Sequence, residues 1–151
     1  MALTSACYAQ KQRKMRKYIV NSLRKFRLLS SADELNYFFH LITTAWDNWR
    51  VVKHNEGLKF PPSRLAFEEF GHVSKSEYLK SGKSYAELLE QLSRPMLLPK
   101  KLKVLEWGCG TARILRHLPD SFSEYKLELF GVDIDEKAID WNQSVLTDFT
   151  F

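Results

Sequence analysis

The chain has no run of about 18 consecutive apolar residues, the length that a helix needs to cross a bilayer. It contains only two cysteines, Cys7 and Cys109, and they lie far apart in the sequence. We therefore expect no disulfide scaffold and a reducing, cytoplasmic location. Internal repeats and low-complexity tracts are also missing, so a repeat architecture is not expected.

Acidic residues are absent from positions 1–32, which carry eight Lys and Arg. The remaining 15 basic and 18 acidic residues give −3, so the net charge of +5 is a basic arm of +8 attached to a mildly acidic body. This local charge does not predict that the protein as a whole binds nucleic acid. The content of 44% hydrophobic and 13% aromatic residues is that of a globular protein.

Within the basic arm, Met15, Ile19, Leu23 and Phe26 recur every three or four residues along segment 10–29. This spacing predicts a basic amphipathic helix. Its role stays open between a solvated helix at the edge of a domain, contact with an anionic lipid or nucleic-acid surface, and a cleavable organelle presequence. We expect the first of these.

Residues 31–95 predict a helical region. Ser31 and Glu34 form a capping box at the start of a long helix, which we expect to end at residues 55–57. One face of this helix is apolar and aromatic, and helical spacing of such residues predicts a core-facing surface. The face consists of Leu35, Phe38, Phe39, Ile42, Ala45, Trp46 and Trp49.

Shorter elements follow the long helix. Residues 63–73 are compatible with a short helix. Residues 74–77 resemble a helix cap, and we expect Gly82 to end the helix that they begin. A further helix is capped by residues 84–87, and the prolines of segment 94–100 predict a linker with a domain boundary near residue 95.

The most informative feature is a glycine-rich turn between two predicted strands. The apolar strand 103–107 leads into the sequence Gly108-Cys109-Gly110, and a helix is predicted over 111–118. A second strand, 127–133, closes on an acidic residue. Strand, glycine turn, helix and distal carboxylate in this order predict a nucleoside-binding βαβ unit in an α/β fold. We therefore divide the chain into the arm 1–30, the helical region 31–95 and a partial Rossmann-like domain 96–151.

Several residues of this unit are candidates for cofactor binding. Gly108 and Gly110 permit a tight reversal and let a ligand approach the main chain, with Cys109 between them. Asp133 ends the second strand, where a carboxylate can accept hydrogen bonds from a ribose diol. Ile134 follows and could lie against an adenine ring. The predicted helix would offer the N-terminal amides of its first turn to a ligand carboxylate or phosphate.

Two residues bear on the choice of cofactor. Arg113 stands where a dinucleotide site favours a small residue for close packing of helix and strand. Glu106 precedes the first glycine by two positions, where its charge would repel a pyrophosphate but suits the cationic methionine part of S-adenosylmethionine. The residues therefore favour S-adenosylmethionine over a nicotinamide dinucleotide.

With these residues the sequence resembles the class I S-adenosylmethionine-dependent methyltransferases over roughly residues 71–142. Their first motif, acidic-x-Gly-x-Gly-x-Gly, matches Glu106 to Ala112, with alanine in place of the third glycine, and their second motif matches Asp133. A bacterial subgroup is similar beyond these motifs. The further matching positions are Arg113, Ile114, Leu115, Arg116, His117, Leu118, Gly131, Ile134, Asp135 and Trp141, together with a stretch similar to EYLKSGKSYAELL.

The resemblance implies an incomplete Rossmann-like methyltransferase sheet of order 3-2-1-4-5-7-6, of which this chain supplies strands 1 and 2. It implies cofactor binding by Glu106, Gly108, Cys109, Gly110, Asp133 and Ile134. We expect the N-terminal part of a longer enzyme that is inactive alone; the acceptor and any catalytic base are unknown, and no metal is expected. Two other functions stay open: an interaction module with a vestigial nucleotide fold, and a nicotinamide-dependent oxidoreductase.

Overall fold

The computed structural model describes residues 29–96 and 100–151. The predicted basic helix over 10–29 lies outside this part of the chain apart from Leu29, and so do residues 97–99 of the predicted linker. Two compact units divide the chain, residues 1–39 and residues 40–151. The second unit holds the glycine turn and both strands.

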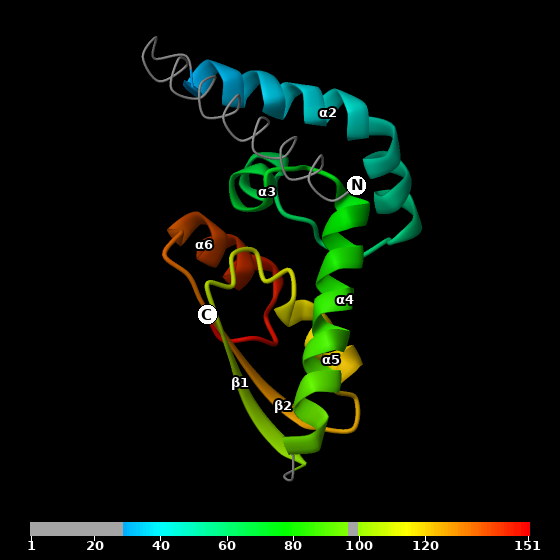
Figure 1. The fold of residues 1–151 in the computed structure, drawn as a ribbon, viewed down its shortest axis with the longest axis vertical. Coiled ribbons are helices and arrows are strands. Elements are labelled where there is room, and N and C mark those ends of the chain that lie inside the picture. Colours follow the sequence, from blue (N-terminus) through cyan, green and yellow to red (C-terminus); the bar gives the residue numbers. More distant parts are fainter. Residues whose placement is uncertain (1–28, 97–99) are drawn as a thin grey trace, which may run out of the picture. The chain divides into compact units, whose positions relative to one another are not determined.

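The described residues form a mixed helical and stranded structure (Figure 1). None of the described helices combines the length and apolar character that crossing a bilayer requires. Short 3-10 turns cover Arg94–Met96 and Leu115–His117. The main elements are α2 (Leu29–His54), α3 (Ser63–Phe70), α4 (Lys75–Ser93), β1 (Lys101–Trp107), α5 (Leu118–Ser121), β2 (Lys126–Val132) and α6 (Glu136–Val145).

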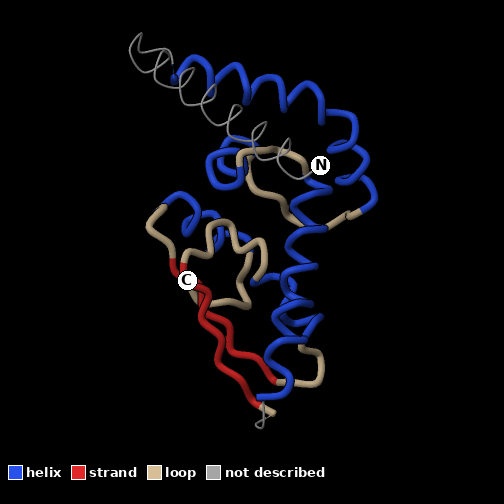
Figure 2. Tube along the Cα trace, in the orientation of Figure 1, coloured by secondary structure: helices blue, strands red, loops and turns tan. Residues whose placement is uncertain are grey.

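Strands β1 and β2 lie side by side in parallel, as predicted (Figure 2). Their register runs from Lys101 opposite Lys126 to Trp107 opposite Val132. A third segment joins β2, because Gly131 donates a 2.8 Å hydrogen bond to the carbonyl of Thr150, whose own N–H donates to Leu129 over 3.0 Å. Successive backbone groups of a strand point to opposite edges. Thr150 therefore lies on the edge of β2 away from β1, in the order β1, β2, Thr150.

One face of the sheet is covered by helices and the other is open. Alternate side chains point to opposite faces, and Leu102 and Leu129 lie on the covered face. The core beneath them consists of Ala86, Leu102, Ala112, Leu115, Leu118, Phe122 and Leu129. On the open face Leu105 and Trp107 are exposed to solvent. The helices therefore bury the apolar side chains on one face of the sheet, whereas those on the other face stay exposed.

Helix α2 differs from its prediction at the beginning but not at the end. Leu29 and Ser30 are already helical, so Ser31 lies within the helix and the expected capping box there is wrong. The predicted end is confirmed, because α2 stops at His54 and the chain turns through Gly57 at φ 92°. The local chain reversal therefore follows from glycine's access to positive φ.

The aromatic face of α2 is not in the core, contrary to expectation. Trp46 and Trp49 are 67% and 53% exposed, and their rings stack 5.1 Å apart. The helix is instead held by Asn48, whose amide donates to the carbonyl of Val73 (2.9 Å) and accepts from the N–H of Lys75 (2.8 Å). A polar contact thus fixes this part of α2, which periodicity alone does not reveal. The other large apolar residues of this face that are exposed are Leu35, Phe38, Phe39 and Ile42.

A single helix, α4, replaces the two that the sequence predicts between residues 75 and 93. Its predicted cap is confirmed, since the Ser74 hydroxyl accepts a hydrogen bond from Glu77 N–H. Gly82 does not end the helix but lies buried inside it, where an added Cβ would come within 2.2 Å of the carbonyl oxygen of Arg113. The glycine therefore serves close approach between α4 and the turn after β1, not chain termination.

The helix predicted over 111–118 is also wrong. Hydrogen-bonded turns occupy 111–114, and the 3-10 turn and α5 follow. Ala112 has φ 53°, a left-handed conformation that is incompatible with a continuous helix. The predicted packing of Leu115 and Leu118 against the sheet is nevertheless confirmed, because both are buried in the core.

Candidate functional site

The glycine turn follows the carboxyl end of β1, where ligands bind in open parallel sheets. Gly108 and Gly110 have φ values of 72° and 48°, which only glycine adopts without strain. The N–H groups of Gly108 and Cys109 both donate to the carbonyl of Val132, over 2.8 and 3.1 Å. These bonds hold the turn against the end of β2 and so bring the two predicted motifs together.

Asp133 bridges the turn and the start of α6. Its carboxylate accepts hydrogen bonds from the N–H groups of Gly110 (2.7 Å) and Asp135 (2.9 Å). The backbone hydrogen bond from Asp135 is the main reason why the pKa of Asp133 lies below its usual value, and that from Gly110 adds to it. Asp135 caps α6 as predicted, accepting from Lys137 N–H over 3.0 Å. Asp133 is therefore an ionised acceptor at the mouth of the site.

Ile134 is 98% exposed beside Asp133. An apolar side chain in that position can pack against the flat face of a ligand ring when another part of the same ligand is hydrogen-bonded to the carboxylate. The neighbouring Trp107 is exposed too, at the end of β1. The carboxyl edge of the sheet thus offers apolar surface next to a fixed carboxylate.

Glu106 lies on the covered face of the sheet, beneath the turn. Its carboxylate accepts a 3.1 Å hydrogen bond from the N–H of Leu115. Burial raises its pKa to about 7, with the hydrogen bond from Leu115 and the charge of Arg113 opposing the shift. Glu106 thus titrates near neutral pH, and a cationic ligand group beside it would favour the ionised form.

The side chain of Cys109 points into the protein, while its main chain belongs to the turn. Burial is the main cause of a pKa of about 12 for its thiol, and the carboxylates of Glu106 and Asp133 raise it further. An added Cβ on Gly131 would lie 2.9 Å from Sγ. The thiol therefore packs beneath the turn, and its raised pKa keeps it protonated near neutral pH.

Three residues outside the predicted site also hold the turn. Tyr78 of α4 donates to the carbonyl of Thr111 over 2.8 Å, and Asn142 of α6 donates to the carbonyl of Gly110 over 2.7 Å. Glu69 of α3 accepts from Thr111 through both N–H (2.9 Å) and Oγ1 (3.1 Å). Asn142 could have been found, because it lies one helical turn after the buried Ala138 on a face that otherwise reads as apolar.

A cavity of about 270 Å³ opens between α3 and the turn. Five of the six predicted residues line it: Glu106, Gly108, Cys109, Gly110 and Asp133. Ile134 does not line it. The remaining lining residues are Glu69, Phe70, Arg113 and Ile114. Within the described residues, no group of three or more His, Cys, Asp or Glu side chains is placed to hold a metal ion.

Arg113 supplies the positive charge among these lining residues. Its guanidinium donates to the hydroxyl of Ser81 over 2.7 Å and lies over the rings of Phe70 and Tyr85, 5.4 and 5.6 Å from their centroids. Its bulk therefore faces α3 and α4, not the strands. The prediction that Arg113 disfavours a dinucleotide through helix–strand packing therefore draws no support from these contacts, and the case against a pyrophosphate rests on Glu106.

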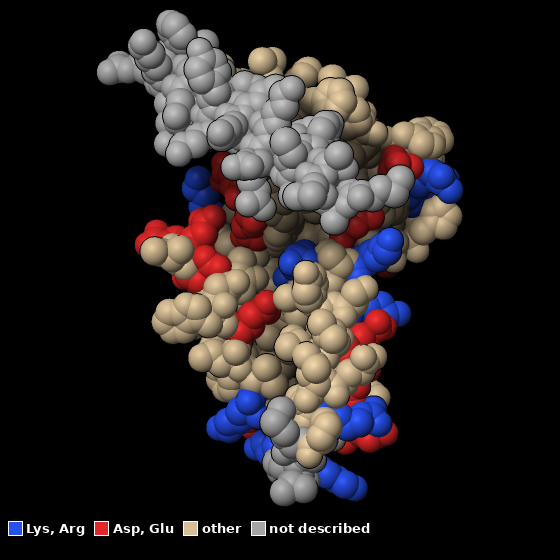
Figure 3. Space-filling view, in the orientation of Figure 1, with Lys and Arg blue, Asp and Glu red and all other residues tan. Residues whose placement is uncertain are grey.

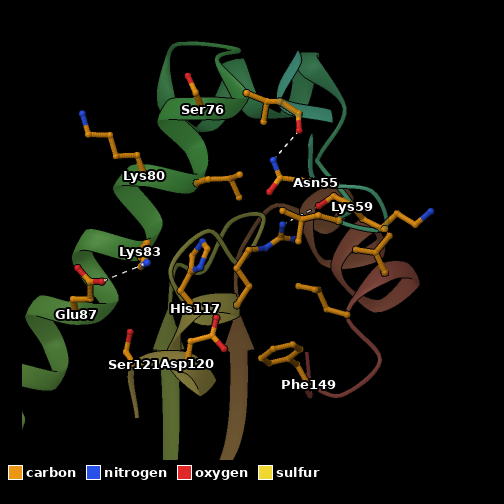
Figure 4. Close-up of a pocket in the computed structure, with 17 residues that line it drawn as sticks. Asn55, Lys59, Ser76, Lys80, Lys83, Glu87, His117, Asp120, Ser121 and Phe149 are labelled. Carbon is orange, nitrogen blue, oxygen red and sulfur yellow. Dashed lines mark hydrogen bonds and ion pairs between the residues drawn. The ribbon is translucent and has the colours of Figure 1, made fainter. Parts of the chain in front are cut away.

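A larger cavity of about 940 Å³ lies elsewhere, among α4, the turn before α5 and the segment after α6 (Figure 4). None of the six predicted site residues lines it. Lys83 there is paired with Glu87 over 3.9 Å, and Lys80 points away from the cavity (Figure 4). His117 enters it with a pKa lowered by burial and by the nearby Arg116. Arg116 also lines this cavity, and side-chain nitrogens of both Arg116 and His117 are buried without a hydrogen-bond partner among the described residues.

Basic and acidic side chains are concentrated at opposite ends of the two strands. Basic side chains gather at the end of the molecule where the strands begin (Figure 3), and Lys100, Lys101 and Lys126 are exposed there. The carboxylates of Glu69, Glu106 and Asp133 lie at the opposite end of the strands.

Searches among known protein families, curated proteins and solved structures find no match to this chain.

Proposed function

We propose that the glycine turn binds S-adenosylmethionine and that the chain is part of a class I methyltransferase of Rossmann-like fold. The observation that carries the proposal is the convergence of Glu106, Gly108, Gly110 and Asp133 on one cavity at the carboxyl edge of a parallel sheet. Cofactors bind at this edge in open α/β folds.

The order of the strands supports the proposed methyltransferase fold. The resemblance implies that strand 2 stands between strands 1 and 3, and here β2 stands between β1 and the segment at Thr150. In that arrangement the outer edge of β1 and the open face with Leu105 and Trp107 would receive further elements of the sheet and its second helical layer.

Each cofactor-binding residue then has a part defined by its contacts. Asp133, held ionised by backbone N–H groups, would accept the ribose hydroxyls, and Ile134 would cover the adenine ring. Glu106 would face the cationic methionine part. In-line methyl transfer depends on positioning, and we assign no catalytic base to this chain. We expect this chain to bind the cofactor in the cytoplasm. We do not expect it to catalyse methyl transfer alone.

Isothermal titration calorimetry of the whole chain tests the proposal. S-adenosylhomocysteine should bind, NAD⁺ should not compete with it, and the Asp133→Ala variant should bind at least about tenfold more weakly, or about 1.4 kcal/mol. The matched control is Asp140→Ala, because Asp140 is exposed on α6. Unchanged affinity in Asp133→Ala, or stronger binding of NAD⁺, would contradict the proposal. Circular dichroism checks that both variants fold.

A second candidate is an interaction module, which the exposed and stacked Trp46 and Trp49 favour. Exposed aromatic residues that lie together are typical of protein contact surfaces. This function predicts a folded chain without affinity for S-adenosylhomocysteine. The same calorimetric titration of the unmodified protein therefore separates the two functions.

A further inference from the structure

Glu69 brings the helical region before the sheet into the cofactor cavity. It lies near the end of α3, 42 residues before Thr111, and its Oε2 accepts hydrogen bonds from both Thr111 N–H and Oγ1. The absence of a side chain at Gly110 makes this approach possible, because an added Cβ would lie 2.5 Å from Oε2. The carboxylate is therefore seated directly on the turn.

This contact changes what the turn can offer a ligand. The sequence predicts that the N–H of Thr111 is among the donors offered to a ligand carboxylate or phosphate, but in the structure this N–H donates to Glu69. The N–H groups of Gly110 and Leu115 are likewise taken, by Asp133 and Glu106. An anionic ligand group finds acceptors here instead of donors.

The second carboxylate oxygen of Glu69, Oε1, is the atom that indicates a ligand. Oε1 is buried, and no described residue donates a hydrogen bond to it. A buried carboxylate oxygen without a donor is costly, and a cation that donates hydrogen bonds satisfies it best. Burial is also the main reason why the pKa of Glu69 lies above its usual value, with Asp133 and Asp135 contributing.

We propose that Glu69 receives the α-ammonium group of the methionine part of S-adenosylmethionine on Oε1, while Oε2 keeps Thr111 in place. This inference rests on the proposed function. It makes α3 part of the cofactor site and assigns recognition of the amino acid end to a residue outside the glycine motif. Glu106 is then left to face the sulfonium end of the same ligand.

The test compares two ligands that differ only in the ammonium group. S-adenosylhomocysteine and its desamino analogue, which keeps the carboxylate, are titrated into the unmodified chain and into Glu69→Gln. The glutamine keeps an acceptor for Thr111 but removes the charge. The matched control is Glu68→Gln, since Glu68 neighbours Glu69 in α3 but pairs with Arg64 over 2.8 Å.

We expect S-adenosylhomocysteine to bind the unmodified chain at least tenfold more tightly than the desamino analogue. In Glu69→Gln this preference should disappear, with the affinity for the analogue unchanged, and Glu68→Gln should behave as the unmodified chain. An equal loss for both ligands would show a purely structural role and overturn the inference, as would unchanged or tighter binding of S-adenosylhomocysteine.

The inference and the proposed function fail in different ways. If the unmodified chain binds neither ligand, the proposed function is wrong and the inference falls with it. If the unmodified chain binds both ligands with equal affinity, the proposed function stands and Glu69 does not recognise the ammonium group. A melting temperature for each variant confirms that the proteins compared are folded.

Discussion

The phenol of Tyr78 donates a 2.8 Å hydrogen bond to the carbonyl oxygen of Thr111, which ties the middle of the helical region to the glycine turn. Tyr78 is 2% exposed, and burial is the main reason why its pKa lies above the usual value. A buried carbonyl in a turn without regular helix has few other partners. The turn thus depends on a side chain 33 residues before it.

Removing this hydroxyl should destabilise the protein. Tyr78→Phe leaves the Thr111 carbonyl without the phenol and should lower the free energy of unfolding by about 1–3 kcal/mol. Urea denaturation measures the change. The matched control is Tyr85→Phe, because Tyr85 is exposed and its ring contact with Arg113 survives in phenylalanine. Equal stability of both variants would mean that the Thr111 carbonyl finds another donor.

Gly82 should resist replacement although it lies inside a helix. Helix propensity alone predicts that Gly82→Ala stabilises α4 by about 1 kcal/mol. The contact with the Arg113 carbonyl predicts the opposite sign, a loss of about 1–3 kcal/mol from overpacking. Thermal unfolding decides between the two. Ser84→Ala, at an exposed position of the same helix, serves as the control and should be neutral or slightly stabilising.

Glu106 should make stability fall as the pH rises. Its pKa of about 7 in the folded protein exceeds the ordinary value of 4.5, so the folded state holds the proton more tightly and loses this advantage between pH 4.5 and 7. Glu106→Gln keeps an acceptor for Leu115 N–H and removes the titration. Relative to the unmodified protein, it should gain up to about 3 kcal/mol between pH 5 and 8. A constant difference across this range, measured by urea denaturation, would contradict the shift.

The exposed position of Trp46 has a direct consequence for stability. Trp46→Ser should change the free energy of unfolding by no more than about 0.5 kcal/mol, the usual range for surface substitutions. A core tryptophan would cost about 3–5 kcal/mol on truncation. Leu115→Ala, at a fully buried core position, is the positive control and should cost about 2–5 kcal/mol. A large loss in Trp46→Ser would place the aromatic face in the core after all.

Local sequence signals predicted the features that depend on near neighbours. The caps at Ser74 and Asp135, the end of α2 and the two parallel strands all follow from short-range hydrogen bonding or alternation, and the structure has them. Asp133 ends the second strand as predicted, and the structure adds its hydrogen bond from Gly110, since the carboxyl ends of adjacent parallel strands meet at one edge. These features need no knowledge of the rest of the chain.

Other features depend on contacts between residues far apart in the sequence, and there the predictions from sequence are wrong. Gly82 reads as a helix end until the Arg113 carbonyl is seen against it. The helix expected over 111–118 gives way to turns because Thr111 is bonded from α3 and α4 and Ala112 adopts a positive φ. The same applies to Glu69, whose place on the turn has no local signal.

By itself, the sequence determined a parallel βαβ arrangement with a glycine turn and a carboxylate at one sheet edge, since residue spacing and backbone conformation settle these locally. Only the tertiary structure decided that Glu69 and Tyr78 hold that turn and that the aromatic stripe of α2 is exposed. The physical reason is that burial and hydrogen-bond partners depend on which segments meet in space. Periodicity tells which residues share a face but not what that face contacts.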